Sequence, residues 1–237
     1  MRPTLTSDIY GEKFLTSGRV VIPPNECTQA EWHGCDRQGT SDNLINPIRS
    51  ARVDTRESFS FKYGTLEIRA KMPQGDWIWP ALWLMPKDSV YGGWPRSGAI
   101  TLMEMRGNRN LFNGNVNVGV EQAGSTLHYG PSSSENGWPK AHYTRNENLG
   151  FADDFHVYKL VWTPSFIQFS VDGNNIGTVN AEKGFWARGG FSGANIWEGR
   201  EIMAPFDQEF YIIMNNAVGG VGFFADGFVN RDYPKPW

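Results

Sequence analysis

Residues 94–108 read Trp94-Pro-Arg-Ser-Gly-Ala-Ile-Thr-Leu-Met-Glu-Met-Arg-Gly-Asn108 and form the most informative stretch of the chain. On a regular β-strand, positions 99, 101 and 103 share one face, and position 104 points to the other. A β-bulge between positions 101 and 104 brings Glu104 back onto the face of Ala99 and Thr101. The pattern predicts a strand, and a bulge of this kind would put one carboxylate on that shared face.

Alternation of apolar and polar residues recurs along the rest of the chain, which is typical of strands with one buried face. It is found at residues 58–62, 65–71, 115–120 and 167–172, and Arg19–Ile22 is a further short candidate strand. The 27 glycines and 14 prolines are typical of short strands joined by turns. No segment keeps a helical period, so we expect an all-β fold, a sandwich of two antiparallel sheets.

Length and charge narrow the possible classes of protein. A chain of 237 residues suits one large domain, and we expect a single domain over residues 1–237. The net charge of −3 leaves no basic surplus to neutralise phosphates, which makes nucleic acid a poor candidate partner. The longest apolar-rich run, Trp77–Met85, is shorter than the roughly 20 residues of a transmembrane helix, so no membrane span is expected.

The cysteines and the tryptophans indicate in which compartment the protein is found and what kind of ligand it binds. Cys27 and Cys35 flank a turn that contains glycine, and we expect them to form a disulfide rather than two free thiols. A disulfide implies an oxidising compartment, and a secreted location is expected although no signal peptide is visible. The 10 tryptophans either fill the core or line a groove in which flat rings stack on the C–H faces of sugars. Composition leaves both open.

Together with Gly75–Pro86, residues 94–108 resemble the active-site strand of family 16 glycoside hydrolases. These are jelly-roll β-glucanases with a concanavalin A-like fold, and their motif on this strand is Glu-x-Asp-x-x-Glu. The resemblance implies a nucleophile at the first position, an assisting Asp at the second and a general acid/base at the third. In this sequence those positions hold Ala99, Thr101 and Glu104. The resemblance therefore implies the site but not the reaction, because a methyl group cannot form a glycosyl-enzyme intermediate.

The resemblance extends over nearly the whole chain. Residues 125–130, 154–164, 167–173 and 215–220 are similar to later strands of the family. Residues 27–39, with Arg49-Ser-Ala-Arg52, are similar more narrowly to the invertebrate β-1,3-glucan recognition proteins, also called Gram-negative bacteria-binding proteins, which are secreted immune sensors. From this resemblance we expect the chain to be shortened at both ends and to lack the separate N-terminal glucan-binding domain that those proteins usually carry.

The same resemblance implies residues that contact sugar. Trp79 and Trp94 flank turns beside the active-site strand, where the family places aromatic rings against the substrate, although each could instead be a core residue. His128 and Asn215 match cleft positions, with a structural role as the alternative for each. Arg69, on the polar face of its strand, is expected in the groove rather than as a solvated charge.

Two further segments receive a structural interpretation. Trp83 lies in a strand-like apolar run and is expected in the core. Asp153 and Asp154 precede a strand and are read as a solvated turn. We therefore expect no metal site and no cofactor.

The sequence favours non-catalytic binding of β-1,3-glucan polysaccharide or oligosaccharide for pattern recognition in innate immunity. One alternative is an active endo-β-1,3-glucanase whose nucleophile lies elsewhere. Another is an engineered inactive enzyme in which Ala99 and Thr101 were introduced. A purely structural interaction protein would be favoured if no glucan binds.

Overall fold

The computed structural model describes residues 1–27 and 30–237, and the chain divides into two compact units, Met1–Ala51 and Arg52–Trp237. The prediction of a single domain stays a prediction. Strands dominate the second unit, and all its pairings are antiparallel, as alternation of the sequence predicts.

In the described residues of the first unit, 1–27 and 30–51, there are two small antiparallel sheets and three short helices. β1 (Thr4–Leu5) pairs with β4 (Ile48–Arg49), and β2 (Arg19–Val21) pairs with β3 (Asp36–Gln38). The helices are α1 (Ser7–Tyr10), α2 (Phe14–Ser17) and the 3-10 turn η1 (Glu31–His33). Cys27 and Cys35 form a disulfide with their Cα atoms 5.7 Å apart, which confirms the predicted pairing.

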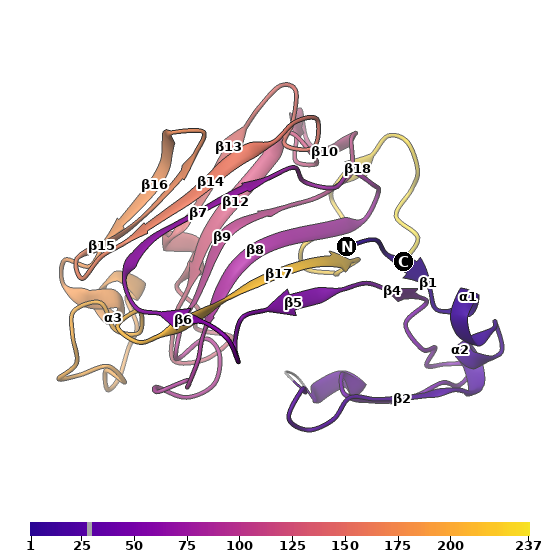
Figure 1. Cartoon of the computed structure of the whole chain (residues 1–237), viewed down its shortest axis with the longest axis horizontal. Helices are drawn as coiled ribbons and strands as arrows, with labels where there is room; N and C mark the ends of the chain where they lie inside the picture. The colour runs from indigo at the N-terminus through magenta and orange to yellow at the C-terminus, as the bar shows by residue number, and fades with distance from the viewer. Residues whose placement is uncertain (28–29) are drawn as a thin grey trace. The chain divides into compact units, whose positions relative to one another are not determined.

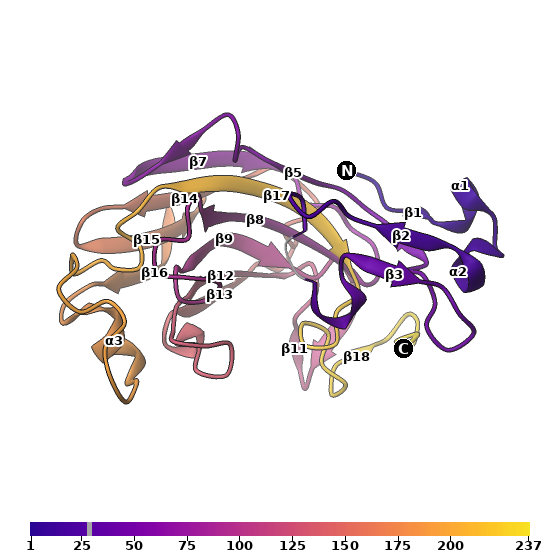
Figure 2. The same cartoon turned by 90° about the horizontal axis from the view of Figure 1, so that it is seen from below.

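The second unit is a sandwich of two sheets, drawn in Figures 1 and 2. The large sheet has seven strands, and the small sheet has four. In spatial order the large sheet contains β13 (His142–Asn146), β12 (Gln122–His128), β9 (Ala99–Met105), β8 (Ile78–Pro86), β17 (Phe210–Val218) and β5 (Arg52–Asp54), with β6 (Ser60–Phe61) also paired to β17. The small sheet contains β16 (Asn174–Asn180), β15 (Phe166–Val171), β14 (His156–Trp162) and β7 (Gly64–Ala70).

The main core lies between these two sheets. Leu84 and Ile100 of the large sheet and Leu160 and Phe169 of the small sheet belong to one buried cluster and have no exposed surface. Because side chains alternate along a strand, filling the core from these positions leaves the intervening residues on the outer faces. The outer face of the large sheet, which carries Glu104, is called the Glu104 face below.

A second, smaller core lies beside the sandwich. It is built from Trp77, Leu111, Val118 and Phe224. A three-stranded sheet contributes to it, made of β10 (Leu111–Asn113), β11 (Val116–Asn117) and β18 (Val229–Asn230). The remaining elements of this unit are the 3-10 turn η2 (Trp138–Lys140) and α3 (Gly184–Gly189).

Two predicted strands are shorter than their alternation indicates. Val118 and Val120 are buried, but β11 ends at Asn117, whose side-chain oxygen accepts a hydrogen bond from the N–H of Gly119 and turns the chain. Residue 59 is outside β6 because the hydroxyl of Thr55 donates to the carbonyl of Phe59 at 2.7 Å and closes a turn. In both places a side chain takes the place of a ladder hydrogen bond.

Candidate functional site

The bulge predicted in residues 101–104 is present in β9. Trp83 pairs with Thr101, and Ala81 pairs with Glu104, with a shift of register between them. Residues 81 and 83 are two apart on one strand and therefore point to the same face, so Thr101 and Glu104 share that face as well. The pairing with β12 shows the same shift, between Gly124 and Thr126.

Ala99 lies on this face too, because it is two residues from Thr101. It pairs with His128 and is only 1% exposed. The three positions that the motif places around a glycosidic bond are therefore brought together on the Glu104 face. They carry a methyl group, a hydroxyl group and one carboxyl group.

The carboxyl group of Glu104 is held by two hydrogen-bond donors. The indole N–H of Trp79 donates to Oε2 at 3.2 Å, and the hydroxyl of Thr126 lies 3.4 Å from Oε1. Burial raises the pKa of Glu104, against the opposing effects of the Trp79 hydrogen bond, the positive charge of Arg106 and the Thr126 hydroxyl. A buried carboxyl group with a raised pKa keeps its proton to higher pH and can donate it.

Trp79 is stacked on Phe223, and Arg106 lies over the ring of Phe223 in turn. The ring of Trp79 lies on Phe223 with the ring centroids 4.0 Å apart and the planes within 8°. The guanidinium of Arg106 lies 4.0 Å from the centroid of Phe223 and donates to the carbonyl of Phe223 at 2.7 Å. Beside this stack is a small hollow lined by Glu104, Arg106, Gln122, Gly124, His142, Thr144 and Phe223.

Trp94 and His128 lie together next to Ala99. Their ring centroids are 5.5 Å apart, and Trp94 is 48% exposed. The side-chain amide of Asn136 lies 3.1 Å from Nδ1 of His128. Burial, with a smaller effect of His142, lowers the pKa of His128 to about 4, so the ring is neutral near pH 7. Trp94 therefore offers an open ring surface beside a neutral hydrogen-bonding group.

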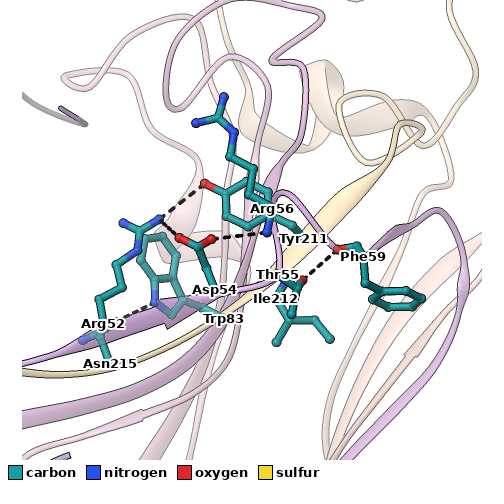
Figure 3. Close-up of polar contacts among 9 residues, drawn as sticks. All are labelled: Arg52, Asp54, Thr55, Arg56, Phe59, Trp83, Tyr211, Ile212 and Asn215. Carbon is teal, nitrogen blue, oxygen red and sulfur yellow. Dashed lines mark hydrogen bonds and ion pairs between the residues drawn. The ribbon is translucent and has the colours of Figure 1, made fainter. Parts of the chain in front are cut away.

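Trp83 and Asn215 form the other side of the site, and Figure 3 shows the hydrogen bond between them and the nearby Arg52 of β5. The indole N–H of Trp83 donates to Oδ1 of Asn215 at 2.7 Å, and the guanidinium of Arg52 lies 5.4 Å from the Trp83 ring. Arg52 also reaches Asp54 and the hydroxyl of Tyr211. The expectation that Trp83 is a core residue was wrong: it pairs with Thr101 and faces the Glu104 side of the sheet.

Arg69 is not brought to this site. It lies on β7 in the small sheet, opposite Val157 of β14, and its guanidinium covers the ring of Phe155 at 4.3 Å. Its neighbours Ile68 and Ala70 pack against the main core, so Arg69 points outward from the small sheet. The alternation correctly placed it on a polar face, but that face belongs to the other side of the sandwich.

The arrangement of carboxylates limits the chemistry. Glu104 is the only carboxylate among the described residues that line the hollow. The other carboxylate in the described strands of the large sheet, Asp54, is three strands away from β9. It pairs with Ile213 of β17, Ile213 pairs with Trp83 of β8, and Trp83 pairs with Thr101 of β9. This separation is roughly 14 Å at about 4.8 Å per strand spacing. Retaining hydrolysis needs two carboxyl groups about 5–5.5 Å apart.

Several side chains of the site had no clear signal in the sequence. Thr126 could have been found, because it is two residues from His128 and shares its face. Nothing in the sequence around the other three, His142, Phe223 and Arg106, marks them as site residues. The Nδ1 atom of His142 lies 2.8 Å from the Thr126 hydroxyl, and Phe223 stacks between Trp79 and Arg106. They enter the site through tertiary packing.

Features outside the site bear on metals and membranes. Asp153 forms an ion pair with Arg109 at 2.9 Å. Within residues 1–27 and 30–237, no group of three or more His, Cys, Asp or Glu side chains is arranged to hold a metal ion. None of the helices in the described ranges is long and apolar enough to cross a membrane.

Comparison with known proteins agrees with the geometry. The chain is 44% identical over 246 residues to a beta-1,3-glucan-binding protein of Penaeus monodon, covering 100% of this chain and 65% of that protein. It is 37% identical over 204 residues to Gram-negative bacteria-binding protein 1 of Drosophila melanogaster, covering 82% of this chain and 38% of that protein. The chain thus spans less than two thirds of the length of either relative.

A solved structure of similar fold is the catalytic domain of an endo-1,3-beta-glucanase (laminarinase) from Thermotoga petrophila RKU-1. It matches with a TM-score of 0.58 and 28% identity over 77% of this chain and 63% of that chain. The jelly-roll fold expected from the sequence is thereby confirmed. The model of glycosyl hydrolases family 16 matches residues 26–204. On its strands, its motif positions and this match, the chain belongs to glycosyl hydrolases family 16.

Proposed function

We propose that this chain binds β-1,3-glucan on the Glu104 face without hydrolysing it. The observation that carries the proposal is the position of Ala99 beside Thr101 on the face of Glu104. A retaining enzyme would need its attacking carboxylate there, and the neighbouring carboxylate in the described part of the sheet, Asp54, is roughly 14 Å away by strand spacing. A site that keeps only the acid can hold a sugar but cannot form the covalent intermediate.

The side chains around Glu104 support binding of a neutral sugar chain. Trp94 presents an exposed ring beside His128, and Trp83 is a half-buried ring on the Glu104 face. Asn215, His128 and Glu104 add hydrogen-bonding atoms on the same face. Flat apolar surfaces with a few polar groups between them suit pyranose rings, which have apolar C–H faces and hydroxyl rims.

The names of the relatives support the ligand and the biological role. One is a beta-1,3-glucan-binding protein, and another is a Gram-negative bacteria-binding protein. We extend these names to this chain as recognition of microbial glucan in innate immunity. The Cys27–Cys35 disulfide supports a secreted, oxidising location.

The second candidate is an active endo-β-1,3-glucanase. It is supported by the enzyme of similar fold and by Glu104, whose carboxyl group is held by Trp79 and has a raised pKa. Hydrolysis would require a nucleophile other than residue 99. The two candidates differ in one observable, the release of new reducing ends from glucan.

The test pairs two measurements on the same preparation. Binding of laminarin oligosaccharides is followed by titration calorimetry, and reducing ends are measured after long incubation with laminarin. Glu104→Gln serves as the matched control, because it removes the acid and keeps the shape of the side chain. Saturable binding without reducing ends above this control supports the binding protein. Turnover that Glu104→Gln abolishes supports the enzyme, and absence of both would leave a structural interaction protein.

A further inference from the structure

A second pocket lies in the segment between β16 and β17, where Figure 1 shows α3. It has a volume of about 260 Å³ and is lined only by residues from the range 183–204. The hollow beside Glu104 is smaller and shares no lining residue with it. This second pocket, called the Trp186 pocket, has no part in the site described above.

The floor and the rim of the Trp186 pocket differ in character. Phe185, Trp197 and Ala204 are buried and form an apolar floor, with Trp186 half-buried among them. The ring of Trp186 meets Trp197 edge to face with the centroids 5.9 Å apart. A rigid aromatic surface of this kind offers contact area at a small cost in conformational entropy.

The charges on the rim of this pocket balance. The rim carries Lys183, Glu198, Arg200 and Glu201, two cations and two carboxylates, all exposed. Glu201 already accepts a hydrogen bond from the hydroxyl of Tyr63 at 2.8 Å. A rim with no net charge gives no preference to an anion or a cation, but it offers donors and acceptors in turn. Hydroxyl groups both donate and accept hydrogen bonds, so they can pair with the cations and with the carboxylates of this rim.

The size of the pocket also restricts its ligand. Pockets for drug-sized ligands have volumes of roughly 300–1,000 Å³. The Trp186 pocket is below this range, so it suits one small ring rather than a chain threaded through it. Of the small neutral ligands, a pyranose combines an apolar face for Trp186 with a rim of hydroxyls for the charged groups.

The pocket is joined to the loop that carries Trp94. The indole N–H of Trp197 donates to the carbonyl of Arg96 at 2.9 Å, and the guanidinium of Arg200 lies 5.8 Å from the ring of Tyr91. The loop of residues 91–96 therefore contacts the Trp186 pocket on one side, and its Trp94 contacts His128 of the Glu104 face on the other. Two sugar contacts joined in this way would raise the avidity for a polymer.

We propose that the Trp186 pocket is a second saccharide site, which takes a single neutral pyranose unit and is separate from the Glu104 face. The avidity for glucan rests on the proposed function, but binding of one pyranose ring in this pocket does not. In this proposal the sugar ring stacks on Trp186, and Glu198 and Arg200 on the rim bind its hydroxyls.

The test follows the indole N–H signals by NMR during titration with methyl β-D-glucopyranoside. Trp186→Phe identifies the Trp186 signal by its loss and keeps an aromatic ring in the packing. We expect this signal to move in the unaltered chain and equally in Trp94→Ala, which lacks the exposed ring of the Glu104 face. Glu198→Ala should weaken the binding about 2- to 12-fold, the effect of one hydrogen bond. Glu67→Ala, an exposed carboxylate on β7, should leave it unchanged.

A Trp186 signal that stays still throughout the titration of the folded chain overturns the proposal. A shift that disappears in Trp94→Ala overturns it as well, because the sugar would then be at the Glu104 face. The Trp94 signal, followed with laminarin oligosaccharides in the same samples, tests the proposed function separately. If Trp186 responds and Trp94 does not, only the proposed function fails; the reverse pattern rejects only the second site.

Discussion

The indole N–H of Trp79 donates a hydrogen bond to the carboxyl group of Glu104 at 3.2 Å. Stacking on Phe223 holds the Trp79 ring in place, so the acid of the site is positioned by a supported partner. Burial raises the pKa of Glu104, as a proton donor requires. Glu104 thus has the support and the raised pKa that the proposed acid position calls for, while residue 99 is an alanine and has no carboxylate.

The first prediction is that restoring the missing groups restores some hydrolysis. In Ala99→Glu/Thr101→Asp, two carboxyl groups would face each other across the bond, and the new Asp would raise the pKa of Glu104 further. Because Ala99 is 1% exposed, the larger side chain should also lower the free energy of unfolding by roughly 1–3 kcal/mol. The measurement is release of reducing ends from laminarin, with circular dichroism as a check of folding.

The control for this variant is Glu104→Gln in the same background. General acid/base help is worth roughly 10²–10⁴-fold in rate, so the added change should remove most of the gained activity. A double variant that folds and binds glucan but cleaves nothing would mean that the groove lacks more than two carboxyl groups.

The second prediction concerns Trp94. If its exposed ring stacks on a sugar, Trp94→Ala should weaken binding of laminarin oligosaccharides by roughly 1–3 kcal/mol. Phe155→Ala removes a similarly exposed ring, 49% exposed, from the side of the small sheet and should change nothing. Calorimetric affinities that are equal for both variants would assign Trp94 to the surface.

The third prediction is a dependence of stability on pH that comes from His128. Burial and the nearby His142 lower the pKa of His128 from 6.5 to about 4, so the folded chain binds fewer protons than the unfolded chain between these values. The contribution of His128 to the free energy of unfolding is therefore highest above pH 6.5. As the pH falls toward 4, His128 lowers this free energy by at most about 3 kcal/mol.

Denaturant unfolding of the unaltered chain and of His128→Gln over this pH range measures the effect. The variant should lose less stability than the unaltered chain as the pH is lowered. Parallel pH profiles would show that His128 has the same pKa in both states.

The fourth prediction concerns the disulfide of the first unit. The Cys27–Cys35 bridge closes a short loop, and loop-closure entropy gives it a stabilising effect of about 2–3 kcal/mol. Cys27→Ser/Cys35→Ser should make residues 1–51 easier to cleave by protease while leaving glucan binding on the second unit in place. Equal protease resistance of the variant and the oxidised chain would contradict the prediction.

The sequence predicted several of the strands, because the alternation of apolar and polar residues along a strand is a local pattern. Alternation placed these strands, and the resemblance of residues 99–104 to the family 16 motif led us to expect the bulge that the pairing of β8 with β9 shows. Alternation does not say which sheet a polar face belongs to, and for that reason Arg69 was assigned to the groove although β7 lies in the small sheet.

Trp83 shows a different limit. It lies in a run that is apolar on both faces, and such a run has no alternation from which to choose the buried side. Its position on the Glu104 face depends on the pairing with Thr101 and on the hydrogen bond to Asn215. Phe223 reaches Trp79 from a segment more than a hundred residues away, a contact that only the folded chain reveals.

The most direct test of the central claim is to incubate the unaltered chain with laminarin, and to measure reducing ends and oligosaccharide binding in the same preparation. We predict saturable binding with no reducing ends above those of the Glu104→Gln variant, since replacing the nucleophile of a catalytic set can lower the rate by on the order of 10⁴–10⁶-fold. Release of reducing ends that Glu104→Gln abolishes would contradict the claim and identify the chain as a working glucanase.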